Sequence, residues 1–374
     1  MIYLDNNSTT VISQEVFDCM SPFLKDCYGN PSSSHKWGQK NREAIEKARE
    51  QVAALLECEA KEIYFTGCAT EANNTLIKGI ACYYKDKGKH LITSSFEHPS
   101  VLRSFAYLEQ QGYEVTYLPV SKDGQVSIDA LENSIRPSTI LISIMHANNE
   151  VGSIQPIKKM STIAAQKGIY FHSDAAQSIG KEKVSVKSLG VDMLTLAGHK
   201  FHAPKGIGAF YLRSGIEIEP LLHGTGHERG KRAGTENLPF CVALGAACKI
   251  INETHQNYYS QLLEMRDLLW EKISEGCPNA VLNGGKERLA NTVNISFPGL
   301  IGAEVLALTS DIAASTGAAC TKKPGSFVMR AMGIDDRVAR GAIRFSLSKY
   351  NNRDEILRAS EQIVLAVKKL QNKE

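Results

Sequence analysis

Short apolar segments alternate with longer segments of helical periodicity along the first two thirds of the chain. The apolar segments hold six or seven residues and are rich in β-branched and aromatic side chains, which is typical of buried strands. Between them, segments such as 42–57 and 69–85 repeat apolar residues at intervals of three and four, which predicts amphipathic helices. The predicted strands are EIYFTG (62–67), HLITSSF (90–96), EVTYLPV (114–120), TILISIM (139–145), IYFHSD (169–174), MLTLAG (193–198) and IGAFYL (207–212).

This alternation predicts an α/β fold, in which helices cover a mostly parallel sheet of seven strands. Only about nine residues separate the segment at 193–198 from the one at 207–212, whereas a parallel crossover takes about a dozen or more. The strand at 207–212 is therefore expected to run antiparallel to its neighbours.

The last third of the chain follows a different order. Residues 238 to about 272 predict one long helix, followed by strands near 291–297 and 341–347 and a final amphipathic helix from about residue 353. We expect a large domain at 15–255 and a small α+β domain made of residues 1–14 and 256–374. The boundary then falls inside the long helix, because no Pro- or Ser-rich hinge interrupts the pattern.

Composition restricts the class of protein. The chain has 374 residues, of which 43% are hydrophobic and 22% charged, so it has enough apolar surface for a folded core. Its net charge of +3 provides no field that would attract nucleic acid or an anionic membrane, and no run of about 18 apolar residues predicts a membrane span. We expect a cytoplasmic protein that acts on a small molecule, without a nucleic-acid or membrane partner.

Nine cysteines are spread over the chain without a CxxC pair. An odd number argues against a disulfide framework, and most of them are expected to be small buried side chains. Cys320 differs, because STGAACTKKPGS has the composition of an exposed loop in which Lys322 and Lys323 favour the thiolate. A buried cysteine at a strand end is the alternative. We expect no metal site.

Polar clusters follow five of the predicted strands. Ligands of open α/β sheets bind outside the carboxyl ends of the strands, so these clusters predict one shared site. They read GCATEANN (67–74), FEHPS (96–100), HANNEVG (146–152), SDAAQS (173–178) and AGHKFHAPKG (197–206).

Two of these clusters suggest specific ligand groups. Thr70 opens a helix directly after a strand, where free amides and the helix dipole favour an anion such as phosphate; a plain N-cap hydroxyl is the alternative. Asp174 closes an apolar strand, and its carboxylate needs a cationic or hydrogen-bonding partner there. A protonated ring nitrogen is one such partner, and a helix cap ahead of AAQSIGK is the other interpretation.

Two cations also stand at strand positions. Lys200 ends a strand, where loss of water lowers a lysine pKa and favours Schiff-base chemistry, although the residues alone do not distinguish it from Lys205. Arg344 interrupts the apolar run AIRFSL, so its guanidinium must meet a carboxylate. That carboxylate belongs either to the protein or to a substrate.

The order and spacing of these motifs resemble the NifS/IscS family of cysteine desulfurases, which belong to class V of the fold-type I enzymes that depend on pyridoxal 5'-phosphate (PLP). The resemblance extends over nearly the whole chain and implies the PLP-dependent transferase fold type I. AGHK and GAACT are its most specific segments. The matching segments are YLDNNSTT, CATEANN, EHPSV, HANNEVG, SDAAQS, GHKFHAPKG, ERGKRAGTEN, STGAACT and AIRFSLSKY.

The resemblance implies a role for each residue that would contact the PLP ring. Lys200 matches the lysine that holds PLP covalently and later moves the Cα proton of the substrate. Asp174 matches the carboxylate on the pyridine nitrogen, and Gln177 matches the donor to the phenolic oxygen. His98 matches the imidazole stacked over the ring, an acid/base candidate.

The resemblance also implies residues that contact the PLP phosphate and the substrate. Thr70 and His199 match phosphate ligands, as does Thr235, which reaches the site of the neighbouring subunit and thus implies a homodimer. The residues matched to substrate contacts are Asn7, Asn148 and Arg344, with Arg344 as the clamp on the carboxylate.

The implied reaction converts L-cysteine to L-alanine, with Cys320 attacking the substrate sulfur and becoming a persulfide. This sulfur would supply iron–sulfur cluster or other thio-cofactor assembly through an acceptor protein that the sequence does not identify. Selenocysteine lyase is an alternative, and so is a scaffold or redox sensor that keeps the fold without turnover.

Two positions depart from the family pattern. Ala197 stands where many relatives carry a phosphate-binding serine, which removes one hydroxyl contact worth about 1 kcal/mol. The stretch from Cys320 to Ser326 is about two residues shorter than in iron–sulfur members of the family, as judged from the same resemblance.

Overall fold

The computed structural model describes residues 1–316 and 326–372, and its centre is a seven-stranded sheet in the order β2-β8-β7-β6-β5-β3-β4. All seven predicted strands are confirmed. β8 pairs antiparallel with both β2 and β7, as its short connection predicted, and the other pairs are parallel. The strands are β2 (Ile63–Thr66), β3 (His90–Ser94), β4 (Glu114–Leu118), β5 (Thr139–Ser143), β6 (Tyr170–Asp174), β7 (Met193–Ala197) and β8 (Gly208–Leu212).

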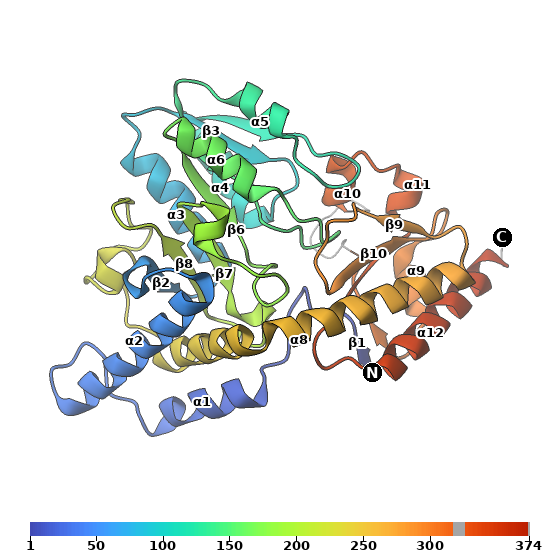
Figure 1. Cartoon of the computed structure of the whole chain (residues 1–374), viewed down its shortest axis with the longest axis horizontal. Coiled ribbons are helices and arrows are strands. Elements are labelled where there is room, and N and C mark those ends of the chain that lie inside the picture. The colour runs from blue at the N-terminus through green and yellow to red at the C-terminus, as the bar shows by residue number, and fades with distance from the viewer. Residues whose placement is uncertain (317–325, 373–374) are drawn as a thin grey trace.

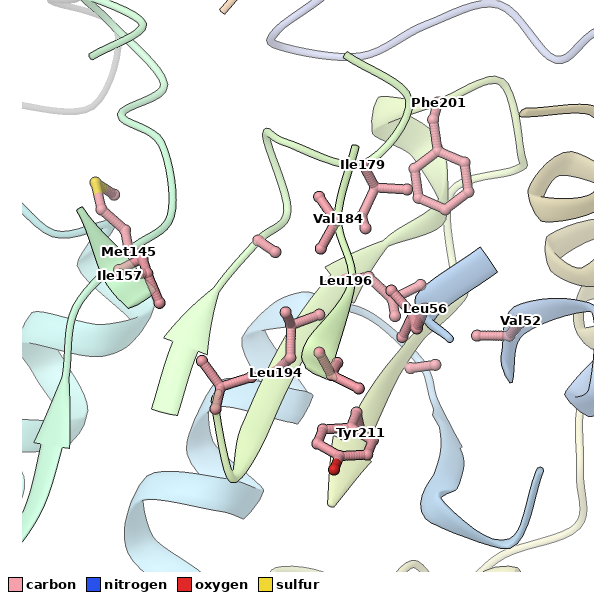
Figure 2. Close-up of a cluster of buried hydrophobic side chains, with 14 of the residues drawn as sticks. Val52, Leu56, Met145, Ile157, Ile179, Val184, Leu194, Leu196, Phe201 and Tyr211 are labelled. Atoms are coloured by element: carbon pink, nitrogen blue, oxygen red, sulfur yellow. The ribbon is translucent and has the colours of Figure 1, made fainter. Parts of the chain in front are cut away.

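Helices cover both faces of this sheet (Figure 1). Because side chains alternate along a strand, Ile63 and Phe65 of β2 join one hydrophobic cluster and Tyr64 joins another on the opposite face. Figure 2 shows part of the first cluster, in which Leu196 and Tyr211 project from β7 and β8. The helices are α1 (Gln14–Lys25), α2 (Lys36–Leu56), α3 (Ala69–Tyr83), α4 (Pro99–Gln110), α5 (Ile128–Ser134), α6 (Ile157–Gln166) and α7 (Val186–Leu189).

The predicted long helix is confirmed as α8 (Leu238–Gly276), which extends from the large sheet to the carboxyl-terminal part of the chain (Figure 1). Its first half packs in the cluster that contains Phe65, and its second half packs in a third cluster with Ile2 and Leu4. The division of the chain near residue 255 stays a prediction. Among the described residues, no helix combines the length and apolarity needed to cross a membrane.

Two small sheets contribute side chains to the third cluster. One has the order β12-β10-β9 and is antiparallel, and the other pairs β1 with β11 in parallel, so the amino-terminal segment joins the carboxyl-terminal part of the chain. The remaining elements are β1 (Ile2–Tyr3), β9 (Val281–Asn283), β10 (Thr292–Ser296), α9 (Gly302–Ala307), β11 (Ile312–Ala313), α10 (Phe327–Ala331), α11 (Asp336–Ala339), β12 (Ala342–Ser346) and α12 (Arg353–Gln371).

Candidate active site

A cavity of about 1040 Å³ opens at the carboxyl ends of the central parallel strands. Its volume lies at the upper limit of the usual range for ligand pockets, and residues from the amino-terminal segment and from β12 complete its wall. The structure thus brings together most of the residues proposed for the site. Those that line the cavity are Asn7, Thr70, His98, Asp174, Gln177, His199, Lys200 and Arg344.

Lys200 is the last residue of a short 3-10 turn that directly follows β7. Its Nζ donates to the backbone oxygens of Asn7 at 2.6 Å and Ser8 at 2.8 Å. The pKa of Lys200 is lowered to about 8, first by burial and then by the charge of Arg344. A reactive neutral amine is therefore accessible near neutral pH, and the exposed Lys205 does not line the cavity.

Asp174 ends β6 and presents a buried carboxylate to the cavity. Its Oδ2 accepts a hydrogen bond from Asn73 Nδ2 at 2.7 Å, and its Oδ1 accepts one from the backbone nitrogen of Ala176 at 2.9 Å. Asn73 also donates to Ser100 Oγ at 2.8 Å and is itself fully buried on α3. Sequence reasoning missed Asn73, because an asparagine inside a helix gives no signal that it supports a carboxylate.

His98 caps the amino end of α4 and opens on the cavity. The backbone nitrogen of Ser100 donates to its Nδ1 at 3.1 Å, so the neutral ring carries its proton on Nε2. The surrounding protein withdraws the ring from water, which lowers its pKa, while Asp174 opposes this effect and Lys200 adds to it. A neutral imidazole therefore faces the cavity at physiological pH.

Gln177 and Asn7 form a buried hydrogen-bonded wall next to Lys200. Gln177 Nε2 donates to the backbone oxygen of Asn7 at 3.0 Å, and Gln177 Oε1 accepts from Lys181 Nζ at 2.9 Å. The side chain of Asn7 donates to Thr292 Oγ1 at 2.8 Å and accepts from Lys181 at 3.2 Å. The Asn7 amide is therefore occupied by protein partners, and its backbone oxygen faces Lys200.

The first turn of α3 forms the end of the cavity suited to an anion. Thr70 lies within this turn and is exposed, whereas Cys68 is the N-cap residue, so the interpretation of Thr70 as a capping hydroxyl is wrong. Gly208 permits this approach of α3 to β8, because a Cβ there would lie 2.8 Å from the carbonyl carbon of Cys68. His199 and Ala197 line the same cavity, and burial lowers the pKa of His199 to about 4.

The expectation that most cysteines are buried is wrong for the described part of the chain. Three of the eight cysteines there are buried, two are partly buried and three are exposed. Cys68 is among the exposed ones and lines the cavity. Its position at the start of a helix on a cavity wall depends on tertiary contacts that the cysteine spacing does not encode.

Arg344 reaches the cavity from β12 and meets a protein carboxylate. Its Nη2 contacts Asp5 Oδ1 at 2.6 Å and Ser8 Oγ at 2.7 Å, and its Nη1 donates to the backbone oxygen of Asn149 at 2.9 Å. Its buried Nε has no hydrogen-bond partner in the described ranges. The ion pair with Asp5 therefore exists, and of the two carboxylates considered for Arg344 the protein one is present.

Two proposed site residues lie away from this wall, and a third is not described by the structure. Asn148 is buried and does not line the cavity, because its Oδ1 accepts from the backbone nitrogens of Glu150 and Val151 while its Nδ2 donates to Phe96 O. Thr235 is exposed and likewise absent from this wall. Cys320 lies outside the described residues. The roles of these three residues stay predictions.

The chemistry of the cavity fits PLP. A carboxylate suits the pyridine nitrogen, a lysine of lowered pKa suits the aldehyde, and the amino end of α3 suits the phosphate. The structure thus supplies the three groups from three different strand ends. Within residues 1–316 and 326–372, no cluster of three or more His, Cys, Asp or Glu side chains could hold a metal ion.

Comparisons with known proteins agree with this arrangement. A model of the class V aminotransferase family matches residues 2–358. The cysteine desulfurase IscS of Methanosarcina thermophila is 46% identical over 99% of this chain and 93% of the relative. A solved NifS-like protein has a TM-score of 0.93 at 38% identity and covers 98% of this chain and 99% of its own.

A second solved structure, described as SspA in complex with cysteine, has a TM-score of 0.84 at 37% identity and covers 94% of this chain and 100% of its own. Together these similarities confirm the fold-type I architecture and favour desulfuration over the selenocysteine lyase and sensor alternatives. The chain therefore belongs to the class V aminotransferase family, as a PLP-dependent enzyme of the NifS/IscS-like cysteine desulfurase type.

Proposed function

We propose that this enzyme removes sulfur from L-cysteine, releases L-alanine and carries the sulfur as a persulfide on Cys320. The convergence of Lys200, Asp174 and Arg344 on one cavity supports the proposal most directly. These residues are the amine, the ring-nitrogen partner and the carboxylate clamp that such a reaction requires. The similar solved structure that holds cysteine supports the choice of substrate.

The residues of the cavity would divide the binding of PLP among them. Lys200 would bind it through its amine, Asp174 would hold the proton on its ring nitrogen, and Thr70 with His199 would bind its phosphate. PLP supplies, when bound, an electron sink for the carbanion at the substrate Cα. Gln177 would donate from Nε2 to the phenolic oxygen, because its Oε1 is turned toward Lys181.

Substrate binding would depend on Arg344, which lines the cavity and carries the positive charge that a carboxylate requires. A carboxylate held there would lie beside Asn7 and Lys200, since all three residues line the cavity. Once released from the coenzyme, the Lys200 amine would take the proton from Cα, and its lowered pKa suits this exchange near neutral pH. His98, which lines the cavity with its proton on Nε2, would act as a further acid/base group.

Cys320 would complete the reaction as the nucleophile. Its thiolate sulfur forms a bond with the substrate sulfur while the substrate carbon–sulfur bond breaks, and the carbon keeps the electron pair and gains a proton on the way to alanine. A lysine pair at 322 and 323 would favour the thiolate.

Replacement of Cys320 by alanine tests this function. We expect PLP binding to persist while alanine and sulfide formation from L-cysteine fall by more than about 100-fold. Undiminished desulfuration would refute the nucleophile assignment, and retained selenocysteine turnover with loss of cysteine turnover would favour a selenocysteine lyase.

The proposal includes a homodimer in which Thr235 contacts the phosphate bound by the other subunit. Support comes from the exposure of Thr235 and from its absence among the residues that line the cavity of its own chain. Mixing inactive Lys200→Ala chains with Thr235→Ala chains should restore one intact site per heterodimer. Mixed dimers no better than Thr235→Ala dimers would refute the exchange.

Sulfur acceptance by another protein is the last part of the proposal. The name of the similar IscS proteins supports iron–sulfur cluster assembly, and the free cysteines of the described residues support a reducing compartment such as the cytoplasm. Incubation with labelled cysteine and candidate acceptors should show which one removes the label from Cys320.

A further inference from the structure

Lys181 is a buried lysine, 3% exposed, that contacts two residues of the cavity wall, Gln177 and Asn7. Its Nζ donates to two amide oxygens, Gln177 Oε1 at 2.9 Å and Asn7 Oδ1 at 3.2 Å, and none of its hydrogen-bond partners in the described part is a carboxylate. An amine buried without a carboxylate costs free energy that a methionine would not. None of the roles proposed for the residues of the cavity requires this cost.

The contacts of Lys181 set the orientation of Gln177. An amide side chain has an acceptor end and a donor end, and the two N–H groups of an amine at this position donate to the oxygen ends. Because Gln177 Oε1 faces Lys181, Gln177 Nε2 must face the backbone oxygen of Asn7 and the cavity. The donor end is thereby directed to the side where Lys200 lies.

Asn7 is oriented by the same amine. Its Oδ1 accepts from Lys181 and from Asn291 Nδ2 at 3.1 Å, while its Nδ2 donates to Thr292 Oγ1 at 2.8 Å. The backbone oxygen of Asn7 accepts from both Lys200 and Gln177. One buried amine therefore holds both Asn7, which contacts the reactive Lys200, and Gln177, which is the expected donor to the coenzyme.

The electrostatic surroundings agree with an amine that donates two hydrogen bonds. Burial, with the charges of Lys200 and Arg344, lowers the pKa of Lys181 well below its ordinary value. A neutral amine has two N–H groups, and the two amide oxygens use both.

We propose that Lys181 is a positioning residue, which holds Gln177 with Nε2 toward the phenolic oxygen of PLP. The inference rests on the proposed function, because that function gives Gln177 its role toward the coenzyme. Without Lys181 the Gln177 amide is free to turn, and Oε1 would then oppose the phenolic oxygen as a second acceptor. Loss of the hydrogen bond from Gln177 Nε2 to the phenolic oxygen corresponds to roughly a 10-fold weaker affinity.

A double-mutant cycle tests this role through the dissociation constant of PLP for the apoprotein. In the Gln177 background, Lys181→Met should weaken PLP binding by about 10-fold. In the Gln177→Leu background, the same substitution should change it by less than about 2-fold, because the amide to be oriented is gone. A purely structural role would give the same fold-change in both backgrounds, and that result would overturn the proposal.

Matched variants keep the test decisive. Lys205→Met removes an exposed lysine outside the cavity and should leave the dissociation constant within about 2-fold. If Lys181→Met does not fold, Lys181→Leu replaces it, since leucine also has no donor, and equal effects in the two backgrounds again count against the proposal. A wild-type chain without PLP binding would overturn the proposed function as well, whereas PLP binding and desulfuration without coupling would overturn this inference alone.

Discussion

Lys200 and Asn7 are joined by a hydrogen bond of 2.6 Å, from Nζ to the backbone oxygen, although 193 positions separate them in the sequence. The contact depends on the amino-terminal segment, which β1 anchors to β11 and which then continues into the cavity wall. Lys200 is therefore oriented by a part of the chain remote from its own strand. Its amine is held within the cavity beside Arg344, which also contacts this segment through Asp5 and Ser8.

The first prediction concerns the pH dependence of PLP capture by the apoprotein. The neutral amine is the nucleophile, and a pKa of about 8 in place of 10.5 makes it roughly 300 times more abundant at pH 7. The rate of covalent capture should rise about 10-fold per pH unit below pH 8 and become constant above it. Stopped-flow absorbance of the lysine-bound coenzyme measures this rate.

A variant of Arg344 tests whether the pKa of Lys200 determines this pH dependence, because the charge of Arg344 is the second cause of the lowered pKa. In Arg344→Gln, the pH at which the capture rate becomes constant should move upward. A wild-type rate that still rises above pH 9, or a variant with an unchanged profile, would contradict the assignment.

The second prediction concerns Asn73, which donates to the Asp174 carboxylate at 2.7 Å. Asn73→Leu removes one charge-assisted hydrogen bond from this carboxylate and leaves the one from the Ala176 backbone, a loss of about 1.5–3 kcal/mol, or roughly 10- to 150-fold in an equilibrium constant. Because Asp174 would hold the ring nitrogen, PLP affinity should fall within this range. Equilibrium dialysis measures it, and Asn133→Ala on the exposed side of α5 should show no change.

The sequence predicted the sheet well because the strands are short apolar runs and the connections have diagnostic lengths. The antiparallel direction of β8 followed from a loop too short for a crossover helix. Lys200 and Asp174 could be found for a related reason, since a charged residue that closes an apolar strand must lie at the edge where ligands bind.

The residues that sequence reasoning missed are reached only through tertiary contacts. Asn73 contacts Asp174 across 101 positions, and Asp5 contacts Arg344 across 339. The sequence did carry one signal for Asp5, a carboxylate directly after a short apolar strand, which could have been matched to the unpaired guanidinium of the predicted strand at 341–347.

Two adjacent asparagines of one motif differ in their position relative to the cavity, while the role of Asn148 stays a prediction. The motif HANNEVG holds two of them, and the resemblance assigned the ligand contact to Asn148. In the structure Asn149 lines the cavity, whereas Asn148 Oδ1 accepts from backbone nitrogens of its own turn and its Nδ2 donates to Phe96 O. Which of two neighbours faces a cavity depends on backbone dihedral angles in one turn, and the residue types do not encode this.

The third prediction uses Glu97, a buried carboxyl that accepts from the backbone nitrogen of Met145 at 2.9 Å. Burial raises its pKa from 4.5 to about 8. The folded state therefore binds more protons than the unfolded state between these values, and the free energy of unfolding falls as pH rises through this window. Glu97→Gln removes this titration. The free energy of unfolding of the variant, relative to that of the wild type, should therefore increase from pH 5 to pH 8.

Urea unfolding of both apoproteins at several pH values measures the difference. The comparison is made relative to pH 5, where the wild-type carboxyl is protonated and resembles the amide most closely. A constant difference across the window would show that Glu97 ionises normally. Glu132→Gln on α5 is the matched surface control and should give no pH-dependent gain.

The fourth prediction concerns the buried pair of Arg49 and Glu228, whose two hydrogen bonds are 2.7 and 2.8 Å long. Glu228 also accepts from the backbone nitrogen of Phe65 on β2 at 2.8 Å. Arg49→Met would leave the carboxylate buried and unpaired, so the free energy of unfolding should fall by about 3–5 kcal/mol. Denaturant unfolding of the apoprotein measures the loss.

An exposed ion pair is the control that shows whether burial of the charge, and not the loss of an ion pair as such, causes this fall in the free energy of unfolding. Arg136 and Glu114 also contact each other, with side chains 51% and 69% exposed, so Arg136→Ala should cost at most about 1 kcal/mol. The double variant Arg49→Met with Glu228→Leu should recover part of the loss, because no charge then remains buried. If the single and double variants were equally unstable, the cost would come from packing around α2 rather than from an unpaired carboxylate.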